Sequence, residues 1–157
     1  MCKNRPCFGT PEEFEKIIDA GYSDKLRINR YIGRPKGGEL NEKDLEGLSE
    51  SLKKSLMVLV EFQKKNPNPF EEDVLILSGS TEKDINQIAQ FMPTGTCGFL
   101  ENDLCILHDL GLKPEQGRNS CCDDSLDKSE NNLYYAKLWA TDKGREVIEK
   151  FKKTIKK

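Results

Sequence analysis

The feature that most constrains this chain is the placement of its cysteines and its single histidine. Cys2 and Cys7 open the sequence with a C-x4-C spacing, and a second group follows within a stretch of 26 residues. That second group comprises Cys97, Cys105, His108, Cys121 and Cys122. Thiolates and imidazoles bind zinc and other soft or borderline metal ions. The pattern therefore predicts a metal site that ties the start of the chain to its late loops.

Length, charge and hydropathy narrow the class of protein. A chain of 157 residues suits a single metal-binding domain over residues 1–157, with one modest core. The net charge of -2 argues against a nucleic-acid partner. The longest apolar run, residues 56–60, is far short of a membrane span, so we expect no membrane partner. No signal-peptide pattern precedes Cys2, and we expect a cytoplasmic protein whose clustered cysteines stay reduced.

The first predicted helix begins at Thr10, which can cap it, with Pro11 in the first turn and Glu13 closing a capping box. Gly21 is a C-terminal stop signal. For residues 26–31 we predict a short helix or a turn.

A helical insertion is predicted over residues 33–92. Leucines at spacings of three and four predict a long helix over residues 41–65. The β-type run at residues 74–77 predicts a short strand, and residues 81–92 a short helix with Thr81 at its start.

The last third of the chain should combine turns and helices. Glycines and a proline punctuate residues 97–122, which we predict as cysteine-rich turns. We predict an exposed acidic linker over residues 123–130 and C-terminal helices over residues 131–157. Thr141 should cap the last helix, and Trp139 should anchor the C-terminal helices in the core. The predicted fold class is mainly α with a short β element, a small single domain with Cys-rich turns around a metal site.

Zinc takes four ligands at ~2.0–2.3 Å. The C-x2-H spacing of Cys105 and His108 brings two of them within one turn of chain. The preferred ligands are Cys2, Cys7, Cys97 and Cys105, with Cys121 and His108 as replacements. Adjacent residues of an extended chain point to opposite sides, so one of Cys121 and Cys122 should ligate, and we favour Cys121.

Other interpretations of the cysteines stay open. They can be buried thiols of a small core or members of a disulfide framework. His108 can support a ligand by hydrogen bonding instead of binding the metal. Asp109 or Asn119 could orient a Cys–His nucleophile, but no catalytic motif is identified, so an enzyme activity stays an open question.

Three segments carry a resemblance to a known family. They are the C-x4-C opening with the Gly-Thr-Pro-Glu-Glu that follows, residues 95–108 with their C-x-F-L and C-x-x-H elements, and residues 111–118 with Lys-Pro. On these segments the chain resembles the zinc- or iron-chelating domain family, the CxxCxxCC or YkgJ-like group. The Ala-Lys-Leu-Trp of residues 136–139 resembles one branch of that group.

The resemblance implies chelation of Zn²⁺ or Fe by cysteines, with an iron–sulfur cluster among the options. Cys7, Cys97, Cys105 and Cys121 fall on motif positions, and Cys2 does so less securely. It implies no particular reaction. Two alternative functions follow, an iron–sulfur redox or metal-dependent enzyme, and a metal-sensing or interaction module. Neither the resemblance nor the residues identify a protein partner.

Overall fold

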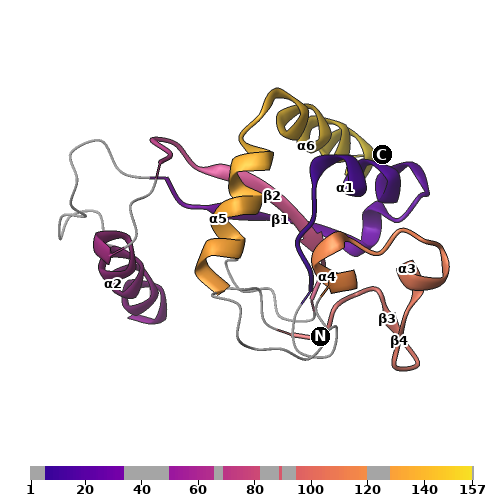
Figure 1. The fold of residues 1–157 in the computed structure, drawn as a ribbon, viewed down its shortest axis with the longest axis horizontal. Coiled ribbons are helices and arrows are strands. Elements are labelled where there is room, and N and C mark those ends of the chain that lie inside the picture. The colour runs from indigo at the N-terminus through magenta and orange to yellow at the C-terminus, as the bar shows by residue number, and fades with distance from the viewer. Residues whose placement is uncertain are drawn as a thin grey trace. The chain divides into compact units, whose positions relative to one another are not determined.

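The computed structural model describes residues 6–33, 50–65, 69–81, 89, 95–119 and 128–156. The protein is a small domain, about half helical, with two two-stranded antiparallel sheets (Figure 1). The prediction of a small domain that combines helices with short β structure is confirmed, and the structure has a second small sheet beyond the predicted element. By its internal contacts the chain divides into two compact units, residues 1–31 with 74–157, and residues 32–73.

The larger unit holds most of the elements. Its helices are α1 (Pro11–Asp19), η1 (Ser23–Lys25), α3 (Ile106–Asp109), α4 (Glu115–Asn119), α5 (Lys128–Trp139) and α6 (Asp142–Ile155). Its strands are β1 (Leu26–Tyr31), β2 (Val74–Gly79), β3 (Leu100–Glu101) and β4 (Leu104–Cys105). The smaller unit contains α2 (Glu50–Lys65).

Helix α1 begins as its sequence predicts. The Thr10 hydroxyl accepts a hydrogen bond from the Glu13 backbone N–H at 3.3 Å, and the Glu13 carboxylate accepts one from the Thr10 N–H at 3.0 Å. This reciprocal pair is a capping box, and Pro11 occupies the first turn. Gly21 follows the helix with φ +88°, a left-handed conformation that favours glycine.

Strand β1 corrects the prediction of a helix or turn over residues 26–31. It pairs antiparallel with β2, from Leu26 opposite Gly79 to Tyr31 opposite Val74. The hydrogen-bonding partner lies more than forty residues away in sequence, so the local pattern of β1 does not reveal it. The strand predicted at residues 74–77 is confirmed and extends to Gly79.

The core of the larger unit forms where helices meet this sheet. Helices α5 and α6 contact β2, and α1 packs against α6. Trp139, predicted as a core anchor, is 1% exposed, and its ring lies edge-on to Phe14 with centroids 5.8 Å apart. The Thr141 hydroxyl accepts from the Gly144 N–H at 3.3 Å, which confirms the predicted cap of α6.

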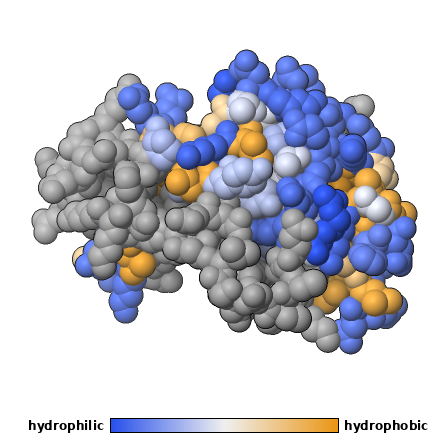
Figure 2. Space-filling view, in the orientation of Figure 1, coloured by the Kyte–Doolittle hydropathy of each residue, from blue (hydrophilic) through white to orange (hydrophobic). Residues whose placement is uncertain are grey.

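Ion pairs join the outer surfaces of α1 and α6. The Lys143 ammonium lies 2.6 Å from the Glu15 carboxylate, and Lys150 lies 2.6 Å from Asp19. The hydrogen bond from Lys143 lowers the pKa of Glu15. In the face shown in Figure 2 the surface over these two helices is mostly hydrophilic. These pairs are at least partly exposed to solvent, so each adds little to stability.

Two predictions for the late segments need correction or lie partly outside the described residues. Residues 97–119 are more regular than the predicted turns, because a β3–β4 hairpin, α3 and α4 form there. Asn102 and Asp103, at φ +47° and +64°, make its two-residue turn. Of the predicted acidic linker, residues 128–130 belong to α5, and residues 123–127 lie outside the described residues.

The smaller unit bears on the predicted insertion at residues 33–92. Helix α2 confirms the long helix from residue 50 to 65, whereas residues 41–49 and most of the helix predicted at residues 81–92 are not described. The Gly33 N–H donates to the Asp73 carboxylate at 2.9 Å, which joins the two ends of this unit. None of the helices that the structure describes has the length and apolar character needed to cross a membrane.

Candidate metal centre

Three of the predicted ligands line one small cavity. Cys7, Cys97 and Cys105 come from separate segments, and all of them belong to the larger unit. The cavity has a volume of about 20 Å³, enough for one body the size of a water molecule. The rest of its wall is mostly apolar and is formed by Phe14, Gly79, Phe99, Leu107, Lys113 and Pro114.

Each cysteine is held by a different element. Cys7 lies in the extended segment that leads into α1, and Cys97 forms an isolated bridge with Thr81 just beyond the end of β2. Cys105 ends β4 and directly precedes α3. Cys7 and Cys97 are 7% and 5% exposed, and Cys105 is half-buried. Tertiary structure thus gathers thiols that are up to 98 positions apart in sequence.

Two glycines let the sulfur atoms approach the backbone. A Cβ atom at Gly79 would lie 2.6 Å from the Sγ of Cys97, and one at Gly117 would lie 2.8 Å from the Sγ of Cys7. Both separations are shorter than real Cβ contacts allow. The Cys97 sulfur therefore occupies the space beside β2 that a larger side chain at position 79 would need. The Cys7 sulfur occupies the corresponding space beside α4 at position 117.

Hydrogen bonds fix the Cys7 segment to late parts of the chain. The Phe8 N–H donates to the Gln116 side-chain oxygen at 2.7 Å, and the Trp139 indole N–H donates to the Gly9 carbonyl at 2.8 Å. Both bonds are buried, so breaking either would leave a polar group unsatisfied away from water. The start of α1 is thereby joined to α4 and α5.

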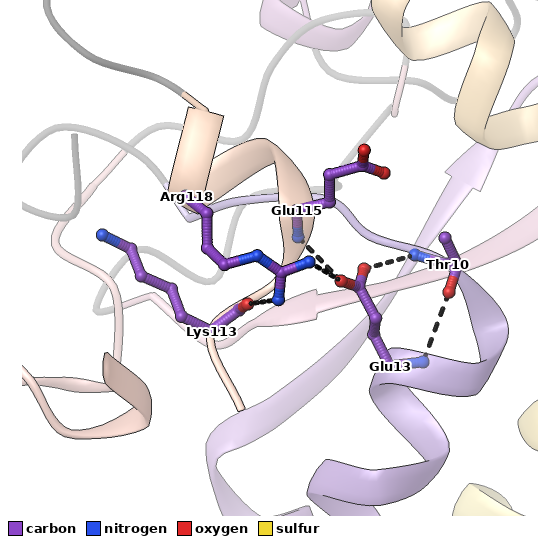
Figure 3. Close-up of polar contacts among 5 residues, drawn as sticks. All are labelled: Thr10, Glu13, Lys113, Glu115 and Arg118. Carbon is purple, nitrogen blue, oxygen red and sulfur yellow. Dashed lines mark hydrogen bonds and ion pairs between the residues drawn. The ribbon is translucent and has the colours of Figure 1, made fainter. Parts of the chain in front are cut away.

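Glu13 extends this attachment (Figure 3). Beyond its capping bond to Thr10, its carboxylate accepts from the Glu115 N–H at 2.9 Å and pairs with the Arg118 guanidinium at 3.0 Å. Arg118 also donates to the Lys113 carbonyl at 2.6 Å. One carboxylate therefore caps α1 and holds the first turn of α4, the two elements that flank the Cys7 thiol.

Tyr135 lies next to the segment that carries Cys7, and its surroundings disfavour ionisation of its hydroxyl. Burial raises the pKa of the Tyr135 hydroxyl, and the carboxylates of Glu115 and Glu13 raise it further. The Tyr135 ring packs on Phe8, next to Cys7, with centroids 6.4 Å apart. Tyr135 is accordingly a neutral, buried neighbour of the site.

The remaining predicted ligands are placed differently. Within the described ranges, no three Cys, His, Asp or Glu side chains converge as a bound metal ion requires. His108 is exposed on α3 and is absent from the cavity wall. Cys2, Cys121 and Cys122 lie outside the described residues. The full ligand set stays a prediction.

Sequence reasoning did not assign Lys113, Pro114 and Gly117 to the site. By local pattern, Pro114 and Gly117 indicate loop punctuation and Lys113 a solvated surface charge, and the Lys-Pro element contributes to the family resemblance. Only the packing of that segment on the Cys7 region gives these residues a place at the cavity.

Comparison of the chain with models of known protein families, with curated proteins and with solved structures finds no match. The resemblance to the zinc- or iron-chelating domain family therefore stays a prediction, based on the motif residues alone.

Because Glu13 joins α1 to α4, its removal should measurably lower the stability of the protein. Replacing Glu13 by alanine should lower the free energy of unfolding by about 2 kcal/mol, because the backbone N–H groups of Thr10 and Glu115 lose a charged acceptor. The exposed Arg118 adds little to this figure. Urea denaturation would measure it. Glu12→Ala, an exposed change in the same turn, should cost less than about 1 kcal/mol, and equal losses would contradict the argument.

Proposed function

We propose that this protein binds a single zinc or iron ion through its clustered cysteines. The observation that supports this best is the shared cavity, whose lining includes Cys7, Cys97 and Cys105. Three separate segments each contribute a thiol to one small space, and thiolates are ligands that zinc and iron accept.

The shape and chemistry of the cavity favour one ion over a cluster. A volume of about 20 Å³ accommodates one water-sized body, whereas an iron–sulfur cluster contains several iron and sulfide atoms. The apolar wall excludes competing oxygen ligands, which suits thiolate coordination of a borderline ion. In this proposal these three cysteines supply three of the ligands, and the fourth would be Cys2, with Cys121 as its replacement.

The ion would have a structural role by this proposal. A metal held by thiolates contributes its binding free energy to folding. It would join the segment before α1 to the β3–β4 hairpin, which the described hydrogen bonds of Phe8, Gly9 and Glu13 do not reach.

Elemental analysis tests this proposal directly. Protein purified without added metal should contain about one equivalent of zinc or iron per chain. A colourless sample indicates zinc, whereas a brown sample bleached by dithionite indicates an iron–sulfur centre. Strongly substoichiometric contents of both metals, together with unchanged thermal unfolding in a chelator, would refute metal binding.

A further inference from the structure

Among the described residues that line the cavity, Lys113 is the one with a charged side chain. We propose that the Lys113 ammonium provides the counter-charge for a thiolate-bound metal ion in this cavity. This inference rests on the proposed metal-binding function and adds a residue that sets the affinity of the site. Lys113 acts by its charge, without being a ligand.

The position of the lysine stem supports this role. A Cβ atom at Gly117 would lie 2.8 Å from the Cys7 sulfur, 3.1 Å from the Lys113 Cε and 3.4 Å from its Cγ. Because both atoms lie near one point, the Cys7 sulfur and the Lys113 Cε are at most about 6 Å apart. The charge lies on the nitrogen one bond beyond Cε, at most about 7.5 Å from that sulfur, a separation at which two charges still interact in a poorly solvated setting. The stem thus packs beside the Cys7 thiol, and the ammonium follows one bond further.

The two nearby cations differ in what they contact. Arg118 is paired with Glu13 and donates to the backbone of residue 113, which fixes the lysine at its main chain. The Lys113 side chain extends away from both residues (Figure 3). Among the carboxylates that the structure describes, none forms an ion pair with Lys113, and its side chain is half-buried. Its charge is therefore not neutralised by any carboxylate that the structure describes.

The charge of the bound ion explains why a cation is needed there. Zinc with three or four thiolates carries a net charge of about −1 or −2. A buried anion in an apolar wall is unfavourable unless an opposite charge accompanies it. Lysine supplies a point charge on a flexible stem and leaves the thiols as the ligands.

The test measures Zn²⁺ affinity of the full chain by competition with a chromophoric chelator. Lys113→Met keeps the stem and removes the charge, and should bind Zn²⁺ roughly tenfold more weakly than the wild type. Lys113→Arg keeps the charge and should stay within about threefold. Lys16→Met makes the same change in net charge at an exposed position of α1 and should leave the affinity unchanged.

Several results would overturn the proposal. The local charge would not be responsible for Zn²⁺ affinity if Lys113→Met bound Zn²⁺ as tightly as the wild type. The same conclusion would follow if Lys113→Arg or Lys16→Met lost as much affinity as Lys113→Met. Thermal unfolding of the metal-free variants shows whether a loss of affinity comes from a less stable fold instead of the missing charge. If Lys113→Met is unstable, Lys113→Gln provides a second variant without the charge. A wild type that itself fails to bind Zn²⁺ would refute the metal-binding function and this inference with it.

Discussion

Replacing Trp139 by alanine is expected to lower the free energy of unfolding by about 3–5 kcal/mol. The indole is buried, packs against Phe14, and donates the buried hydrogen bond to the Gly9 carbonyl. Its removal leaves a cavity and an unsatisfied acceptor, and both costs add. This loss is a large share of the 5–15 kcal/mol typical of native proteins, so urea denaturation should show a strongly shifted midpoint.

Two companion variants separate packing from hydrogen bonding. Trp139→Phe retains most of the ring volume and loses the N–H, and should cost about 1–3 kcal/mol. Tyr134→Ala, on the same helix but 51% exposed, should cost less than either. If Tyr134→Ala were as damaging as Trp139→Ala, the stability of α5 would not depend on its buried face.

Alanine at Cys97 is expected to reduce Zn²⁺ affinity by a hundredfold or more, and alanine at Cys7 should do the same. Both thiols are buried on the cavity wall, and loss of a direct ligand should exceed the ~10–100-fold effect typical of residues that only support a ligand. His108→Ala should change the affinity by less than about twofold, because its side chain is exposed and away from the cavity.

Chelator competition on each full-length variant measures these affinities, and elemental analysis gives the metal content of each purified protein. Thermal unfolding of the metal-free forms controls for lost packing, since each alanine also removes a buried sulfur. Retention of one equivalent of zinc by both cysteine variants would contradict the assignment. A large loss in His108→Ala would instead indicate a mixed sulfur–nitrogen site.

The variants form two sets, one that tests the stability of the fold and one that tests metal affinity. Trp139, Gln116 and Glu13 hold the segment that carries Cys7, whereas Cys7, Cys97 and Lys113 would act on the ion itself. Variants of the first set should unfold more easily and lose metal only as a consequence of unfolding. Variants of the second set should lose metal while the fold persists.

Local signals in the sequence were sufficient for elements whose hydrogen bonds are local. The capping box of Thr10 and Glu13 and the cap at Thr141 involve residues three apart, so adjacent chemistry predicts them. Strand β1 was mistaken for a helix or turn because its ladder depends on β2, which is distant in sequence. The hairpin turn at Asn102 and Asp103 is local as well, and it is formed by residue types that tolerate positive φ.

The same distinction applies to the candidate site. Residue types alone indicate which groups could bind a metal, since cysteine and histidine are the usual ligands of structural zinc sites. By itself the sequence determined the candidates, the local caps and the predominance of helices. Only the tertiary structure decided that Cys7, Cys97 and Cys105 share a cavity, that His108 is exposed, and that Lys113 lies on the cavity wall. The physical reason is that convergence of distant segments depends on how buried surfaces pack, which no local spacing records.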